Sequence, residues 1–331
     1  MGEWKNLTSN LAGMASECGN MSTLSVKPDE DMLIAGIAIG GLWSSTNGGT
    51  SWTQLGTATG SDMILNRTSA IVYDPVHPQT FWESGTYSGG GVYETTDDGM
   101  TFTRQGSDTH SDLVSIDFSD PDRKTLLAGG HEASQSLNRS ADSGATWTSI
   151  GAGLPNNTNC TSPLVIDSQT YLVGCGGYGG GFAGIVRSTD GGATWTQVGT
   201  SGGSRAPLQA TDGSIYWASA TNGGMARSTD NGVTWTSTVG SGVLMTAPPI
   251  ELPDGRIAAV GSNAIVVSSD QGVTWTAVTS DIPYVKSVGY NDTNGVQYSV
   301  PQKAFYIWHS DCGSSVPADA ILRYDFDYMA N

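Results

Sequence analysis

The feature that most constrains this chain is an eight-residue pattern that occurs six times along its 331 residues. The copies share the form S/T-x-D/N-x-G-x-x-W/F and lie at 45–52, 95–102, 140–147, 188–195, 228–235 and 268–275. Their closing aromatic residues recur at intervals of roughly 40 to 50 residues, the length of one four-stranded blade of a β-propeller. The repeat therefore predicts an all-β propeller.

Each copy has the chemistry of a turn between two strands, and we call these segments the repeat turns. The carboxylate can accept backbone N–H groups, glycine can take a positive φ, and the aromatic residue can pack against a neighbouring sheet. These properties favour a role in the scaffold, with ligand or metal binding by the aspartates as the alternative. The pattern resembles the Asp box of sialidases and of many other propellers that are not sialidases.

The two ends of the chain predict a seventh blade. Each repeat turn is followed by a short strand, and the N-terminal segment 4–7 has the same pattern with no turn before it. The segment from about 285 to 328 supplies strand-like runs but no repeat turn and no outer strand. Strands from both ends would close the ring and remove its open edge. We therefore expect one domain, 1–331, that is a seven-bladed propeller; a six-bladed ring with a C-terminal ribbon is the alternative.

The charge excludes several classes of partner. The formal net charge is −17 with 14 basic residues, whereas nucleic acids and anionic membranes are bound chiefly through Lys and Arg. There is no apolar run of membrane-spanning length, and we expect no signal peptide because the first residues lead directly into the expected closing strand. We expect a monomer that binds neither nucleic acid nor membrane, and a mature secreted protein whose signal was replaced by an initiator Met.

Cysteines and glycosylation sequons also favour secretion. The sequons lie at Asn6, Asn20, Asn66, Asn138, Asn156, Asn159 and Asn291. We expect two disulfides, Cys160 with Cys175 inside blade 4 and Cys18 with Cys312 across the ring closure. Four free buried thiols in a cytosolic protein are the alternative.

The repeat also predicts which side chains share a face. In a blade with strands a to d, the a–b and c–d turns lie on one face, and the b–c loops and d–a connections lie on the other. The repeat turns are c–d turns, so a ligand site is expected at the opposite face, which we call the mouth. His77 is expected on the face of the repeat turns. The mouth is expected to hold Arg67, Tyr87, His110, Asp112, His131, Glu132, Tyr178, Arg205, Asn222, Asn263, Tyr284, Lys286, Trp308 and His309.

The mouth residues do not fit a sialidase. Sialidases carry an Arg-Ile-Pro motif and three arginines that bind the substrate carboxylate, and this chain lacks the motif. Of its nine arginines, Arg139, Arg187, Arg227 and Arg323 are expected in or beside outer strands. The resemblance to sialidases therefore covers the scaffold and not the catalytic residues.

Histidine, tyrosine and arginine together fit β-elimination better. Lyases that cleave uronic-acid polysaccharides need a cation for the C6 carboxylate, a base for the C5 proton and an acid for the departing oxygen. The chain resembles seven-bladed propeller lyases that use His, Tyr and Arg, in particular rhamnose–glucuronate lyases. Because the repeat places them at the mouth, we expect His110, His131, Tyr87, Tyr178 and Arg67 to be catalytic residues. We expect substrate binding by Arg205, Asp112, Glu132, Tyr284, Trp308 and His309.

The expected partner is a polysaccharide or oligosaccharide substrate. No cofactor and no catalytic metal are expected, and a structural Ca²⁺ stays open. Asp112 and Glu132 could instead be the carboxyl pair of a glycoside hydrolase. A non-catalytic propeller that binds glycans is the third possibility.

Overall fold

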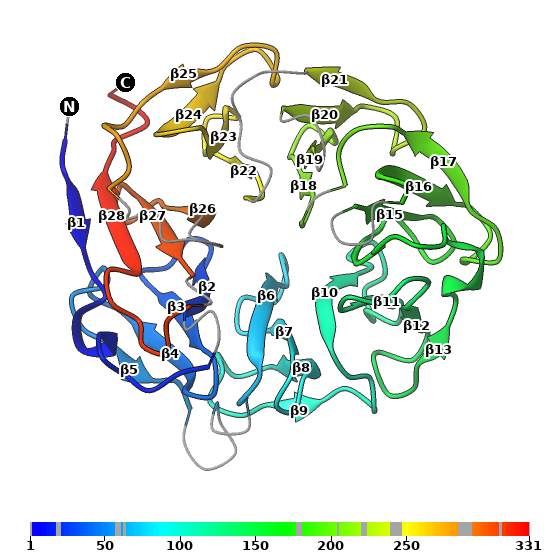
Figure 1. Ribbon diagram of the computed structural model, residues 1–331, viewed down its shortest axis with the longest axis horizontal. Helices are drawn as coiled ribbons and strands as arrows, with labels where there is room; N and C mark the ends of the chain where they lie inside the picture. Colours follow the sequence, from blue (N-terminus) through cyan, green and yellow to red (C-terminus); the bar gives the residue numbers. More distant parts are fainter. Residues whose placement is uncertain are drawn as a thin grey trace.

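The structure is a ring of seven four-stranded antiparallel sheets arranged around a central axis (Figure 1). It is a computed structural model that describes residues 2–17, 21–56, 61, 64–176, 181–203, 205–219, 224–238, 247–283, 293–310 and 313–330. The prediction of a seven-bladed all-β propeller is confirmed, and a six-bladed ring with a ribbon is wrong. In the described residues, the helical elements are the short 3-10 turns η1 (Ser9–Leu11) and η3 (Gly151–Gly153).

In blades 1 to 6, strands a to d run outward from the axis in chain order. Blade 1 contains β2 (Met21–Val26), β3 (Leu33–Ile37), β4 (Gly41–Ser45) and β5 (Thr53–Gln54). Blade 2 contains β6 (Arg67–Tyr73), β7 (Phe81–Thr86), β8 (Gly91–Thr95) and β9 (Thr103–Arg104). Blade 3 contains β10 (Ser111–Ile116), β11 (Leu126–Gly130), β12 (Leu137–Ser140) and β13 (Thr148–Ser149).

The next three blades repeat this order. Blade 4 contains β14 (Ser162–Val165), β15 (Tyr171–Cys175), β16 (Gly184–Ser188) and β17 (Thr196–Gly199). Blade 5 contains β18 (Leu208–Gln209), β19 (Ile215–Ala218), β20 (Met225–Ser228) and β21 (Thr236–Thr238). Blade 6 contains β22 (Ile250–Glu251), β23 (Ile257–Val260), β24 (Ile265–Ser268) and β25 (Thr276–Ala277).

Blade 7 is built from both ends of the chain. Its sheet has the order β1-β28-β27-β26, with β26 (Thr293–Ser299), β27 (Ala304–His309), β28 (Ile321–Asp325) and β1 (Trp4–Asn6). Trp4 pairs with Tyr324 in antiparallel register, and their rings lie 5.2 Å apart. The predicted closure by the N-terminal strand is therefore present, and it covers the edge that β28 would otherwise expose.

The hydrophobic core is divided among the interfaces between blades. The buried apolar side chains of the described residues fall into seven clusters, one between each pair of neighbouring blades. The cluster between blades 7 and 1, for example, joins Leu24 to Tyr306 and Ile321. Because each blade buries apolar surface on both faces, the ring holds its blades at fixed angles and so fixes the mouth.

The repeat turns share one hydrogen-bond arrangement. In the copy at 188–195, Ser188 Oγ accepts the Gly192 N–H at 2.9 Å and donates to Asp190 Oδ1 at 2.8 Å. Asp190 also accepts from the backbone and side chain of Thr194, and these bonds lower its pKa to about 2. Trp195 packs into the cluster between blades 3 and 4. The turn and packing roles predicted for the repeat are thus present.

One expected disulfide joins Cys160 to Cys175, at the start and end of the inner hairpin of blade 4. The expected pair Cys18–Cys312 lies outside the described residues. Among the sequons, Asn66 is 1% exposed in the folded chain, so it cannot carry a glycan there. No helix in the described part of the chain is long and apolar enough to span a membrane.

Candidate functional site

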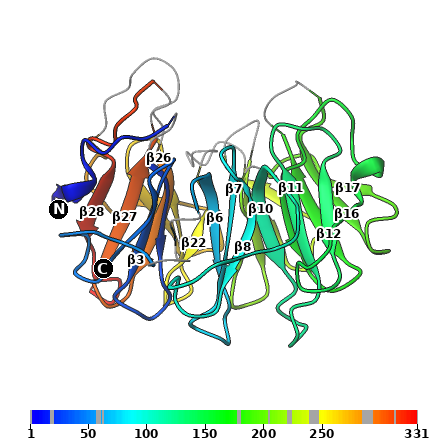
Figure 2. The same cartoon turned by 90° about the horizontal axis from the view of Figure 1, so that it is seen from below.

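The mouth of blades 2 and 3 gathers the residues with acid–base chemistry. Figure 2 shows the blades from the side, with loops projecting above and below the sheets. Tyr87 follows β7 and His131 follows β11, both in b–c loops. Arg67 begins β6 and His110 directly precedes β10, where the d–a connections end. The prediction that these residues share one face is confirmed by the strand order, and His77 lies in the a–b turn of blade 2 on the other face.

Three side chains form a hydrogen-bonded series at this mouth. The Tyr87 hydroxyl lies 2.9 Å from His131 Nε2, and His131 Nδ1 lies 2.7 Å from Asp112 Oδ1. Asp112 is the second residue of β10, which pairs with β11 and so brings the carboxylate beside the imidazole. Both ring nitrogens of His131 are occupied by protein groups. A ligand at the mouth would therefore meet Tyr87 rather than a free nitrogen of His131.

His110 completes an aromatic group around Tyr87. The Tyr87 ring is 5.5 Å from the His110 ring and 5.2 Å from the His131 ring, edge-on to both. The backbone N–H of His131 donates to the carbonyl of His110 at 2.7 Å, which joins the two loops. The His110 residue is exposed to solvent. Its imidazole is therefore accessible to a ligand.

The local charges shift the acid–base properties of the series. The Asp112 carboxylate raises the pKa of His131 by hydrogen bonding, which outweighs the lowering effect of burial and of Arg67. Burial raises the pKa of Tyr87, and the charges of Glu132, Asp112 and Glu17 raise it further while Arg67 lowers it. Both shifts favour the protonated forms. The raised pKa values of Tyr87 and His131 keep both groups protonated to higher pH and also make each of them a weaker acid.

The backbone at the mouth is strained. Tyr87, His110 and Glu132 have φ values of 60°, 57° and 48°, in the left-handed region that residues other than glycine seldom adopt. Such conformations persist where the surrounding structure enforces them, and they gather at functional sites. The three residues lie in three neighbouring connections of blades 2 and 3.

Asp108 stabilises the segment that carries His110 and Asp112, and the sequence analysis did not identify it. Its carboxylate accepts hydrogen bonds from Ser111 Oγ and Asn138 Nδ2, both at 2.5 Å. Burial raises the pKa of Asp108. Because Ser111 lies between His110 and Asp112, this contact fixes the segment that presents both. The signal available in the sequence was an Asp three residues before a Ser at the start of a strand.

The other predicted residues lie further from this group or are covered. Glu132 Oε1 is 3.7 Å from His131 Nε2, with a half-exposed side chain. Trp308 is only 7% exposed and packs between blades 7 and 1, so the expectation that it contacts substrate does not agree with its burial. Burial lowers the pKa of His309 to about 4, which keeps that imidazole neutral.

Arg205 also has a left-handed backbone, with φ of 57°, and its carbonyl accepts a hydrogen bond from Trp217 Nε1. It belongs to the connection that leads into β18 of blade 5, and β18 lies across the ring from β7 in Figure 1. Asn263, in the b–c loop of blade 6, accepts the Ile282 N–H through its carbonyl. Tyr178, Asn222, Tyr284 and Lys286 lie outside the described residues.

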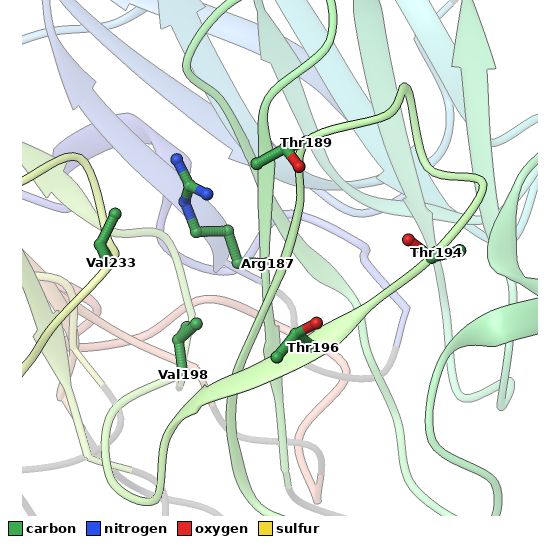
Figure 3. Close-up of a pocket in the computed structure, with 6 residues that line it drawn as sticks. All are labelled: Arg187, Thr189, Thr194, Thr196, Val198 and Val233. Carbon is green, nitrogen blue, oxygen red and sulfur yellow. The ribbon is translucent and has the colours of Figure 1, made fainter.

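A shallow pocket of about 220 Å³ lies elsewhere, on the outer rim between blades 4 and 5 (Figure 3). Its lining includes Arg187, Thr196, Val198 and Val233. Arg187 is the one ionisable side chain of that lining, and its Nε donates to the Asn231 carbonyl at 3.2 Å. No acid–base pair meets in this pocket, so the mouth is the better candidate. Within the described residues, no group of three or more His, Cys, Asp or Glu side chains could hold a metal ion.

The comparisons with known proteins agree on the fold. Residues 122–262, within blades 3 to 6, match the DUF6242 β-propeller domain family. No curated protein matches the chain. The chain is similar to a GH74 xyloglucanase from Xanthomonas campestris, with 16% identity, a TM-score of 0.59 and coverage of 94% of this chain and 52% of that one. This chain thus spans about half of the xyloglucanase.

Two further solved structures are similar over nearly the whole chain. YCF48 bound to D1 peptide has 16% identity and a TM-score of 0.58, with coverage of 99% of this chain and 98% of that one. The extracellular domain of a putative one-component system from B. thetaiotaomicron has 12% identity and a TM-score of 0.63, with coverage of 98% and 40%. At these identities the likeness concerns the fold.

Proposed function

We propose that the chain is a secreted polysaccharide lyase that cleaves uronic-acid-containing glycans, of the rhamnose–glucuronate type, by β-elimination at the mouth of blades 2 and 3. The observation that carries the proposal is the series Tyr87–His131–Asp112, which lies beside His110 and within the electrostatic influence of Arg67. The disulfide Cys160–Cys175 supports secretion, because disulfides persist in oxidising compartments. We also propose that 1–331 folds as one domain and that the repeat turns are Asp boxes.

The elimination assigns a separate task to each group. A base takes the C5 proton of the uronate, the C5–H electron pair forms the C4–C5 double bond, and the C4–O bond breaks with its pair on oxygen. The departing oxygen then takes a proton. His110, exposed and beside Tyr87, is the candidate base. Tyr87 is the candidate acid, and His131 replaces its proton through the 2.9 Å contact.

Arg67 is the candidate ligand of the uronate carboxylate. It is half-buried at the start of β6, and its Nε is buried without a hydrogen-bond partner among the described residues. A chain with a net charge of −17 repels an anionic polymer at long range, so a local cation must offset that field. The acidity of the C5 proton rises when a cation neutralises the adjacent carboxylate.

The test is cleavage of gums, pectins, ulvans and glucuronans, followed by the ultraviolet absorbance of the unsaturated uronate. Tyr87→Phe should reduce turnover by about 10² to 10⁴-fold, the usual effect of losing a positioned acid. His77→Ala on the opposite face is the matched control and should leave turnover unchanged. If Tyr87→Phe keeps wild-type turnover, the proposed acid is wrong. If no uronate polymer yields an unsaturated product, the proposal of lyase activity is wrong.

A glycoside hydrolase is the second candidate. It is favoured by the similarity to GH74 xyloglucanase structures and by two carboxylates, Asp112 and Glu132, that both approach His131. Hydrolysis releases a new reducing end without a double bond. Loss of activity in Asp112→Asn and Glu132→Gln, together with full activity in His110→Ala and Tyr87→Phe, would favour this reaction.

A binding protein without catalysis is the third candidate. YCF48, whose structure holds the D1 peptide, resembles this chain along nearly the full length of both. For this chain the ligand would be a glycan bound at the same mouth. Affinity for a polysaccharide without any product over long incubation would identify this case.

A further inference from the structure

The closing tryptophans of the repeat turns differ in the partner of the indole N–H. In blades 1, 3 and 4 the indole donates to a carbonyl at the end of the outer strand of the preceding blade. That carbonyl belongs to the third residue after the corresponding aromatic residue of the preceding blade. These bonds, of 3.0 to 3.4 Å, run from Trp52 to Leu7, from Trp147 to Gln105 and from Trp195 to Ile150.

Trp235 of blade 5 departs from this arrangement. By the same spacing its acceptor would be Val198, in β17 of blade 4. Instead, Trp235 Nε1 donates to the Gly232 carbonyl of its own repeat turn at 3.1 Å. The outer strand of blade 4 is therefore not joined to blade 5 through this indole.

A groove lies at this point of the outer rim. The pocket of about 220 Å³ in Figure 3 adjoins a second hollow of about 310 Å³, and Val198 lines both. The two hollows form one groove between β17 and the segment 233–237 of blade 5. A hydrogen bond between the hydroxyls of Ser201 and Ser237 joins the two blades beside it. No residue of the mouth lines this groove.

The lining of the groove suits a sugar chain. Trp235 and Val233 supply apolar surface, against which the C–H face of a sugar ring can pack. Hydroxyl and amide side chains of the same lining can bond to sugar hydroxyls. The exposed ones are Thr189, Thr196, Gln197 and Thr200.

Arg187 is the one charged side chain of this lining. Two other arginines stand at the same place of the repeat, eight residues before the closing tryptophan, and each covers a tyrosine ring: Arg139 lies over Tyr171 and Arg227 over Tyr216. No carboxylate of the described residues forms an ion pair with Arg187. Its guanidinium group can therefore pair with an anionic ligand.

We infer that the groove between blades 4 and 5 is a second binding site, for an acidic oligosaccharide whose carboxylate pairs with Arg187 and whose neighbouring ring packs against Trp235. The site is separate from the mouth and goes beyond the proposed function. Asp190 and Asp230 of the adjoining turns and the net charge of −17 all repel an anion, so binding depends on Arg187.

The test is calorimetric titration with tri-galacturonate and with its methyl ester, which keeps the sugar rings but removes the charge. All titrations use a chain that carries Arg67→Gln, so that the mouth lacks its proposed cation. Adding Arg187→Gln should weaken binding of the acid about 5- to 10-fold, the effect of losing a charge-assisted hydrogen bond. Arg139→Gln, at the same place of the repeat but outside the groove, is the matched control and should leave the affinity unchanged.

The outcomes separate the groove from the reaction at the mouth. Equal affinity with and without Arg187→Gln, or for the acid and its ester, would overturn the site. Equally tight binding of a tetraglutamate peptide would also overturn it, since the groove would then select charge and not a sugar. Binding that depends on Arg187, with no cleavage of any uronate polymer by the wild type, would support the groove and refute the lyase.

Discussion

Tyr87 is the residue through which His131 could act on a ligand, because both nitrogens of that imidazole already contact protein groups. The phenol is protonated at neutral pH, and the raised pKa of His131 keeps a proton available to it. In a catalytic triad, by contrast, the carboxylate and the imidazole remove a proton from the nucleophile. The carboxylates of Glu132, Asp112 and Glu17 raise the pKa of Tyr87 and so keep the proton on its phenol, whereas Arg67 lowers that pKa.

The first prediction concerns the cause of the raised pKa of His131. Asp112→Asn should lower that pKa, because the amide keeps the shape of the carboxylate but not its charge. Since the folded pKa lies above the ordinary value of 6.5, the stability that this pair contributes is present below that value and is lost as the pH rises through the folded pKa. Imidazole NMR titration measures the shift. Asp122→Asn, beside Lys124, is the control, and an unchanged His131 pKa in Asp112→Asn would contradict the assigned cause.

The sequence predicted which residues lie at the mouth better than it predicted the contacts that their side chains make. The strand order alone brings Tyr87, His110 and His131 to one face, because b–c loops and d–a connections always share it. It does not specify side-chain rotation, and so it left open which histidine has a free nitrogen. It also placed Trp308 at the mouth, whereas that indole turns into the interface between blades 7 and 1. Burial depends on packing with blade 1, which is remote in the sequence.

At the scale of the element, β7 carries an ionisable group into the interface between blades 1 and 2. Glu83 is fully buried and pairs in register with Ile71 and Tyr93, which both pack in that interface. The Asn66 amide donates to its carboxyl at 3.4 Å. Burial raises the pKa of Glu83 to about 8, although the hydrogen bonds from Thr68 and Asn66 oppose the shift. The strand therefore carries a neutral carboxylic acid at physiological pH.

The second prediction is a pH dependence of stability that this acid causes. The ordinary pKa is 4.5 and the folded pKa is about 8, so between these values the folded state holds one more proton than the unfolded state. The free energy of unfolding should therefore fall as the pH rises from 4.5 toward 8. Glu83→Gln should remove this part of the slope in urea titrations at several pH values. Exposed Glu3→Gln is the control, and an identical slope in Glu83→Gln and wild type would refute the assignment.

At the scale of the whole molecule, the ring depends on a short N-terminal strand. Besides its pairing with Tyr324, Trp4 donates from Nε1 to the Ser280 carbonyl at 3.2 Å, and so joins the edge of blade 7 to the segment after blade 6. Neighbouring Lys5 is exposed and forms an ion pair with Asp325. We therefore expect Trp4 to contribute more to the stability of the ring closure than the Lys5–Asp325 ion pair does.

The third prediction compares these two residues. Trp4→Ala should destabilise the protein by about 1.5 to 3 kcal/mol, the usual value for an apolar side chain removed from a packed position. Lys5→Ala should cost about 0 to 1 kcal/mol, as for exposed ion pairs. Denaturant titration measures both, and light scattering should detect association through the uncovered edge of β28 in Trp4→Ala alone. Equal losses in the two variants would show that the closure does not depend on the indole.

The shared seventh blade has a consequence for the order of the chain. The two described ends lie near each other at the periphery of the ring, one leading into β1 and the other beside β25 (Figure 1), so a short peptide linker could join them without crossing the mouth. New ends could then be opened in one of the repeat turns, which lie on the opposite face. Such a circular permutant would keep the seven interfaces between neighbouring blades. Its seventh blade would be formed by one continuous segment instead of by the two ends of the chain. The fold therefore does not require the chain to begin in blade 7.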